Sequence, residues 1–220
     1  MRKLFFALLL TAVPAEAQDW SIGVGSGPFV FGSFVERTTR VSTPDGSATQ
    51  TAMLSAETRP GLAVDLERRL GDRFAIRLEG SFTRAPLGIK GSERQDEAVA
   101  VPAGDIDITT LMLPLIIRIN PRGTFRFHVM GGPAAAAYTL KTRPNAAGTI
   151  PVFRGTRTEW GGAFGAGMAW HWTDRFAVEV NATDINTSSP FREDEIGGIG
   201  AIEIHRPNNL HSTAGIRYRF

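Results

Sequence analysis

The residues that most resemble a catalytic pair are His211 and Ser212, which are adjacent near the C-terminus. Hydrolysis or acyl transfer by a serine requires a histidine base within hydrogen-bond reach and a carboxylate that orients it. Consecutive residues of a β-strand point to opposite faces, so a strand here would separate the two side chains. The pair alone therefore does not predict a catalytic site.

Motifs for metals, cofactors and nucleic acids are also weak. The chain has no cysteine, which excludes disulfides, thiolate metal sites and thiol nucleophiles. The acidic run at 192–195 lacks the spaced oxygen ligands and the glycine of a calcium loop. The glycine-rich run at 23–27 is not followed by the helix that a phosphate loop needs. With no clustered basic face either, we expect no cofactor, no metal and no nucleic-acid partner.

The elements that must position any site are strands, because apolar and polar residues alternate with period two. Three tight turns (70–73, 120–123 and 172–175) alternate with four long polar stretches, 35–56, 86–104, 141–155 and 187–208. This arrangement predicts one all-β unit, an antiparallel up-and-down meander with an even strand number. The eight predicted strands are Trp20–Phe31, Arg59–Leu70, Arg73–Thr83, Asp107–Asn120, Thr124–Leu140, Thr156–Trp172, Arg175–Thr183 and Leu210–Phe220.

The first residues have the layout of a secretory signal peptide. A short basic segment, Met1–Lys3, precedes the apolar run Leu4–Val13, which is too short to span a bilayer. Ala15 and Ala17 then supply the small-x-small pattern of a cleavage site. We therefore predict a signal peptide at 1–17 and a mature domain at 18–220 that lies outside the cytoplasm.

An eight-stranded meander can be a soluble carrier or a membrane barrel, and the aromatic residues favour the membrane barrel. Large aromatics gather beside the tight turns and the chain ends, where an interfacial girdle would lie. The strands also have about the ten residues that a tilted transmembrane strand needs. The predicted girdle consists of Trp20, Phe74, Phe125, Trp170, Trp172 and Phe176.

The register follows from the energetic cost of charge in lipid. A lysine or arginine on the lipid face costs about 2–4 kcal/mol at the bilayer midplane. A slip of one residue in 73–83 would turn Arg77 and Glu79 toward lipid together. The charged faces must therefore point into the lumen, where we expect buried ion pairs. The predicted network comprises Arg77, Glu79, Arg118, Arg126, Glu179 and Arg217.

Two stretches resemble the outer-membrane β-barrel domain family of Gram-negative bacteria. The segments LMLPLIIRIN (111–120) and FRFHVMGGPAAAAY (125–138) resemble that family's central hairpin. The terminal octet TAGIRYRF resembles the signal read by the barrel-assembly machinery, with Thr213, Gly215, Tyr218 and Phe220 in its positions. The resemblance implies insertion into the outer membrane, with periplasmic chaperones, the assembly machinery, membrane lipid and lipopolysaccharide as partners.

The combined prediction is an eight-stranded outer-membrane barrel closed by pairing of the Trp20 strand with the last strand. Its turns would face the periplasm and its four long loops the exterior. Eight strands leave a lumen that side chains can fill, so we expect no open pore. The favoured role is structural or surface interaction, with an unidentified loop ligand. Two alternatives are a lipid-A-modifying acyl hydrolase or transferase and a soluble periplasmic carrier.

Overall fold

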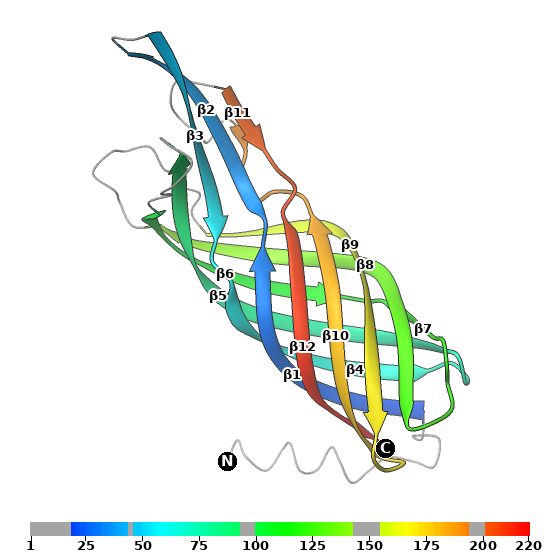
Figure 1. The fold of residues 1–220 in the computed structure, drawn as a ribbon. Coiled ribbons are helices and arrows are strands. Elements are labelled where there is room, and N and C mark those ends of the chain that lie inside the picture. The colour runs from blue at the N-terminus through cyan, green and yellow to red at the C-terminus, as the bar shows by residue number, and fades with distance from the viewer. Residues whose placement is uncertain (1–18, 44–45, 93–99, 143–154, 194–200) are drawn as a thin grey trace, which may run out of the picture.

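The part of the chain that the structure describes is built almost wholly of β-strands (Figure 1). This computed structural model describes residues 19–43, 46–92, 100–142, 155–193 and 201–220, so the predicted signal peptide at 1–17 lies outside it. No helix in these ranges is long and apolar enough to cross a membrane. The strands are β1 (Trp20–Phe31), β2 (Ser33–Thr43), β3 (Gly46–Ala56), β4 (Arg59–Arg69), β5 (Phe74–Ser92), β6 (Ala100–Met112), β7 (Leu115–Arg118), β8 (Phe125–Thr142), β9 (Thr156–His171), β10 (Phe176–Thr187), β11 (Ala201–Ile204) and β12 (Asn208–Arg219).

Antiparallel pairing closes eight of these strand positions into a ring. Starting from β1, the order is β4, β5, then β6 continued by β7, then β8, β9, β10 and β12, which pairs again with β1. At the closing seam Ile22 pairs with Tyr218 and Val24 with Ile216. The amide of Phe220 donates to the carbonyl of Trp20 at 3.1 Å. The predicted all-β, eight-stranded antiparallel barrel is confirmed.

One predicted strand, 107–120, is interrupted. β6 ends at Met112 and β7 begins at Leu115, with Leu113 and Pro114 between them. Proline has no backbone N–H to give to a ladder, so it interrupts regular pairing. The neighbouring strands still contact the break: the Leu113 amide donates to Pro133 O at 3.0 Å and the Arg77 amide to Pro114 O at 3.1 Å.

The expectation that 35–56 is a loop is wrong. This stretch forms most of the hairpin β2–β3, and β3 pairs with the far end of β5. The stretch 187–208 also contains a strand, β11, which pairs with β2. The ends of β5, β6 and β8 run into the stretches 86–104 and 141–155, whose remaining residues, 93–99 and 143–154, lie outside the described chain. Figure 1 shows β2, β3 and β11 projecting beyond the barrel, and we call these three strands the platform.

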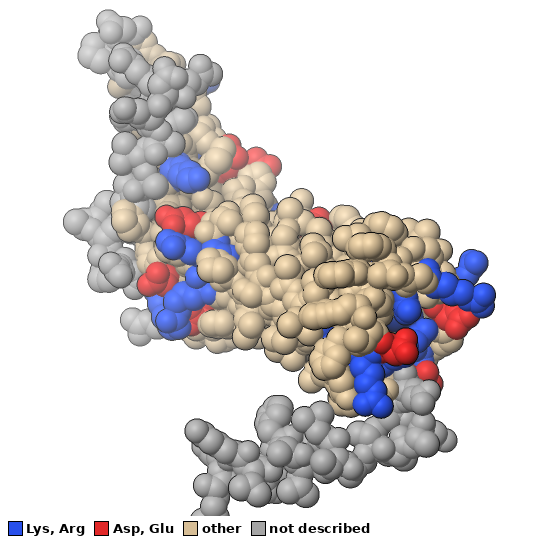
Figure 2. All heavy atoms as spheres, turned by 60° about the horizontal axis from the view of Figure 1, so that its bottom comes forward, with Lys and Arg blue, Asp and Glu red and all other residues tan. Residues whose placement is uncertain are grey.

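The two faces of the barrel have opposite character. Large apolar side chains lie on the outer face, where Leu62 is 52% exposed and Ile216 is 50% exposed, whereas Arg77 inside is 1% exposed. Figure 2 shows a belt without charged residues on the face in view, between charged groups at the two ends. A soluble carrier has an apolar interior and a polar exterior, so that alternative is wrong.

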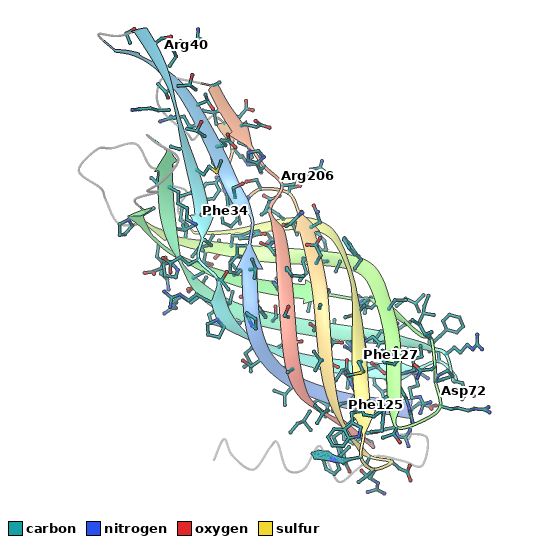
Figure 3. The ribbon with its side chains drawn as sticks, viewed as in Figure 1. Phe34, Arg40, Asp72, Phe125, Phe127 and Arg206 are labelled. Carbon is teal, nitrogen blue, oxygen red and sulfur yellow. The ribbon has the colours of Figure 1, made fainter. Side chains whose placement is uncertain are left out.

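The tight turns mark one end of the barrel, which we call the turn end; the platform lies at the other end, the loop end. Gly71 and Gly123 have φ values of 109° and 106°, which glycine adopts without strain. The predicted girdle lies at the turn end, where Figure 3 labels Phe125 and Phe127 near Asp72. Phe125 stacks on Trp170 with ring centroids 6.3 Å apart, and Trp170 stacks on Trp172 at 6.0 Å.

The girdle continues on the neighbouring strands. The ring of Phe176 lies 5.0 Å from that of Tyr218, which in turn lies 5.3 Å from Phe220. The guanidinium of Arg68 lies 5.5 Å from the ring of Trp20, and Phe74 is 45% exposed on the outer face. All six predicted girdle residues are therefore outward-facing and placed toward the turn end.

Candidate functional site

The middle of the lumen holds a network of ion pairs centred on Arg77. Its Nη2 atom lies 2.7 Å from Glu67 Oε2 and 2.7 Å from Glu179 Oε1. Asp65 and Glu79 lie farther away, at 3.6 Å and 3.8 Å. Three strands of the ring contribute to this contact set, because Arg77 and Glu79 lie on β5, Asp65 and Glu67 on β4, and Glu179 on β10.

A second arginine, Arg217 on β12, contacts three of the carboxylates that surround Arg77, those of Asp65, Glu67 and Glu179. Its Nε lies 2.5 Å from Glu179 Oε2, and its Nη2 lies 2.8 Å from Asp65 Oδ1. Its Nη1 donates to Ser21 Oγ at 3.1 Å. Arg118 on β7 also pairs with Glu67. The network therefore crosses the lumen and also links β12 to β1 at the closing seam.

The structure brings together five of the six residues predicted for the network: Arg77, Glu79, Arg118, Glu179 and Arg217. The sequence prediction omitted the acidic partners Asp65 and Glu67, although both lie on the inward face of the predicted strand 59–70. It also omitted His128, whose Nε2 lies 3.7 Å from Glu179. All three residues occupy inward-facing positions of the alternating pattern, and this could have identified them as members of the network.

Arg126 is placed differently from the other five. Its side chain lines the lumen nearer the turn end, and its Nε donates to the carbonyl of Gly123 at 3.2 Å. Among the described residues it forms no ion pair within 4.0 Å. Alternation predicts that a residue lies on the inner face. It does not predict whether a carboxylate lies at the same height along the barrel axis.

Inward-facing glycines make room for this network. A Cβ added to Gly23 would collide with the carboxylate of Asp65, and one added to Gly167 would meet Asn181 and His128. His128 Nε2 lies 3.0 Å from the Asn181 side-chain oxygen. The glycine-rich run at 23–27 is therefore explained by close packing inside the barrel, and not by phosphate binding.

A polar layer lies next to the network toward the loop end, and it contains the nearest approach to a serine–histidine pair. Ser81 Oγ lies 3.5 Å from His211 Nδ1 and 2.5 Å from Thr110 Oγ1. Nε2 of His211 has no hydrogen-bond partner among the described residues, so no carboxylate orients the ring. His211 is 2% exposed, and Ser212, the next residue of β12, lies on the opposite face of the strand. This arrangement lacks both the third member and the access that an acyl-transfer site needs.

An apolar cluster fills the loop end of the barrel, and we call it the plug. Phe29 stacks on His211 at 3.8 Å, and Phe34 packs edge-on against Tyr138 and Phe191 at 6.1 Å and 5.6 Å. The Tyr138 hydroxyl is satisfied by Thr187 at 2.8 Å and Asn209 at 3.1 Å. Further buried members are Phe31, Val35, Leu54, Leu87, Ile106, Ile108 and Leu140. Figure 3 shows Phe34 at the junction of the barrel and the platform.

The terminal octet lies in the closing strand. Thr213 is 8% exposed and faces the lumen, whereas Tyr218 is part of the aromatic girdle. Gly215 pairs with Gly25 at the seam, where a Cβ would collide with the carbonyl of Val24. Phe220 pairs through its amide with Trp20. Each of the four residues of the predicted assembly signal therefore also has a packing role in the folded barrel.

Residues 4–220 match the model of the outer membrane protein beta-barrel domain family. The chain belongs to this family. Among solved structures it is similar to outer membrane protein OprG from Pseudomonas aeruginosa, with 11% identity, a TM-score of 0.65, and 91% of this chain and 95% of that chain covered. It is also similar to outer membrane protein AlkL in lipid bilayers, with 13% identity, a TM-score of 0.51 and coverage of 92% and 90%. No curated protein matches the chain.

A further match is Neisserial surface protein A, with 12% identity, a TM-score of 0.49, and 92% and 97% coverage. The similarities to OprG and AlkL show the shared fold alone. Membership of the family makes this an outer-membrane protein of the Gram-negative type, embedded in membrane lipid. In the described ranges, no three His, Asp or Glu residues are grouped as a metal ion would require.

Proposed function

We propose that this protein is a closed outer-membrane barrel that supports the platform for contact at the cell surface. The observation that carries the proposal is the continuity between the platform and the barrel. β3 pairs with β5 from Thr51–Ser92 to Ala56–Leu87, and β11 pairs with β2 from Ala201–Thr38 to Ile204–Val35. A three-stranded extension anchored by hydrogen bonds is suited to hold a binding surface at a fixed distance from the membrane.

The plug supports the platform from below. Phe34, Val35 and Leu54, at the root of the hairpin, are all at most 5% exposed and belong to the plug. Ile202 and Ile204 of β11 pack against the same cluster. The outer part of the platform is polar: Arg40 is exposed near the hairpin tip, and His205 lies 3.3 Å from Glu36. A rigid apolar root and a polar tip favour a contact surface over a mobile loop.

The proposal includes a closed lumen and no catalytic role. The plug and the ion-pair network lie in series along the axis, and both are made of side chains from strands on several sides of the ring. The Ser81–His211 pair is buried between them without a carboxylate partner. Assembly through the terminal octet, with periplasmic chaperones and the barrel-assembly machinery as partners, is also part of the proposal.

The orientation is testable because the chain has no cysteine. Single-cysteine variants Ser47→Cys at the hairpin and Arg122→Cys at a tight turn should differ in intact cells. A maleimide that cannot cross membranes should label Ser47→Cys before permeabilisation and Arg122→Cys only after it. Labelling of Arg122→Cys in intact cells would reverse the proposed orientation.

The contact role is tested by shortening the hairpin. Replacing residues 37–53 with a two-residue Asn-Gly turn removes most of β2 and β3 but leaves the root of the plug. Cells that express the intact protein should attach to glycan-coated and plastic surfaces and aggregate with one another, and cells that express this variant should not. The folded barrel is checked by its gel mobility without heating. Equal attachment by cells with the shortened and the intact protein, at equal surface levels, would exclude a contact role for the platform.

A further inference from the structure

The turn end of the lumen opens into a hollow whose walls are rich in arginine. The ion-pair network forms its floor, because Glu67, Arg77 and Glu179 belong to the lining. Nearer the mouth the lining includes Arg69, Arg126, His171, Asp174, Arg175 and Arg219. We call this space the vestibule.

Alternation and register place these cations in a ring. Arg69 is the last residue of β4, Arg126 is the second of β8, and Arg219 is the last of β12. All three lie on the inward-facing register of their strands, as does His171 at the end of β9. Arg175 follows the turn before β10, and its carbonyl accepts the amide of Arg219 at 2.8 Å. Strands from opposite sides of the barrel therefore converge on one basic mouth.

The charges of the mouth are not balanced, unlike those of the floor. Arg77, Arg118 and Arg217 are paired with buried carboxylates. Within the described part of the chain, Arg69, Arg126, Arg175 and Arg219 have no carboxylate within 4.0 Å. Asp174 is the acidic residue of the mouth, and it is exposed.

Arg126 lies close enough to Arg69 and Arg219 for their like charges to act on it, and the opposite charge of Asp174 acts on it less strongly. Repulsion between like charges is strengthened where the barrel wall keeps out part of the solvent. The hydrogen bond from Arg126 Nε to Gly123 O fixes the guanidinium at one edge. Its two terminal NH₂ groups have no hydrogen-bond partner among the described residues. An incoming anion would offset the repulsion and accept these donors.

We propose that the vestibule is a binding site for an anion that carries phosphate groups. The planar guanidinium donates two parallel hydrogen bonds to phosphate oxygens, and several arginines around one space suit a group with more than one negative charge. In the orientation proposed above, the mouth opens to the periplasm, so the phosphate would come from a periplasmic solute or from a phospholipid headgroup at the rim. Binding itself does not depend on that orientation.

The test uses purified barrel in nanodiscs of zwitterionic phosphatidylcholine, with pyrophosphate as the titrant in isothermal calorimetry. The double variant Arg126→Gln/Arg219→Gln should bind pyrophosphate at least about tenfold more weakly, because charge-assisted hydrogen bonds to arginine are lost. Arg122→Gln is the matched control, since Arg122 lies at the same end but is 90% exposed outside the lumen and pairs with Asp72. The control should keep the affinity of the unmodified protein.

Two further measurements complete the test. Gel mobility without heating shows that each variant is a folded barrel, and the NMR signals of the His171 ring should shift on titration only where the vestibule is intact. Repeating the titration in phosphatidylglycerol nanodiscs separates the sources: weaker apparent binding there indicates competition by the headgroup, and unchanged binding indicates a soluble anion. No binding to the unmodified protein, or equal affinity in the double variant, would overturn the proposal.

Discussion

At the scale of single residues, Arg77 is the side chain on which the lumen depends most. It is 1% exposed and lies within 4.0 Å of four carboxylates. We expect Arg77→Ala to lower the free energy of unfolding by about 3–5 kcal/mol, because removing one partner leaves buried charges uncompensated. Urea unfolding in lipid vesicles, followed by tryptophan fluorescence, measures the change.

The control for Arg77 is Arg122→Ala, which removes an ion pair whose side chains are 90% and 68% exposed. Exposed pairs contribute between about 0 and 1 kcal/mol. A loss for Arg77→Ala as small as that of the control would mean that the network does not stabilise the fold.

A second residue-scale prediction concerns Asp107 at the loop end. On the outer face of β5, Phe82 is followed by Arg84, whose Nε donates to Asp107 Oδ1 at 2.5 Å. This hydrogen bond, assisted by Lys141, lowers the pKa of Asp107 from 3.8 to about 2. The pair therefore contributes stability above pH 3.8 that is lost as the pH falls through about 2.

NMR titration of the Asp107 carboxyl group checks this prediction. In Arg84→Gln the pKa of Asp107 should rise toward 3.8, whereas Arg73→Gln at the turn end should leave it unchanged. An Asp107 that titrates at the same pH in the unmodified protein and in Arg84→Gln contradicts the assignment.

At the scale of elements, the closing seam requires glycine at position 215. A Cβ there would collide with the carbonyl of Val24 on the paired strand. We expect Gly215→Ala to destabilise the barrel by about 1–3 kcal/mol, as overpacking does in other cores. Gly91→Ala is the control, because nothing lies within 4 Å of its Cβ position. Similar urea midpoints for both variants would show that the seam tolerates a side chain.

The strands that cross the lipid could be predicted because lipid forces a strict contrast between faces. Leu78 is 46% exposed and Glu79 is 6% exposed, as their alternation in the sequence requires. The hairpin β2–β3 lies beyond the lipid, where both faces are polar and Thr38, Thr39, Thr49 and Thr51 carry no such contrast. Threonine favours strands. A polar stretch without an apolar face shows no alternation, however, so the sequence predicts a loop there. The break at Leu113–Pro114 was also missed, because the outward residues keep their alternation across it.

The site was predictable only to the level of which face a residue occupies. Arg77, Glu179 and Arg217 share the inward register, and in the structure they contact one another because they lie at similar heights along the barrel. The height of Arg126 depends on the stagger between strands, which follows from the pairing of Arg126 with Ala169 and not from the order of residues. The same lack of stagger information hid the approach of Ser81 to His211 across the lumen.

At the scale of the whole molecule, Phe220 belongs both to the closing seam and to the proposed assembly signal. Its amide bonds to Trp20 and its ring packs on Tyr218. We expect Phe220→Ser to lower the yield of heat-modifiable barrel in the outer membrane several-fold, while the variant refolded in detergent keeps most of its stability. Phe127→Ser, which removes an outward aromatic of the same end, is the control for lost girdle contact. A yield equal to that of the unmodified protein would remove the case for a terminal assembly signal.

At the same scale, the plug and the ion-pair network lie in series along the lumen, and this arrangement leads to the last prediction. An ion entering from the loop end meets the plug, and one that passed it would meet Arg77 with its carboxylates. We therefore expect no conductance steps from the purified protein in planar bilayers, and none after Phe29→Ala/Phe34→Ala, although these changes empty part of the plug. The double variant should unfold at lower urea because large buried side chains are lost. Conductance steps in that variant alone would show that the plug is the single barrier and that the ion-pair network lets ions pass.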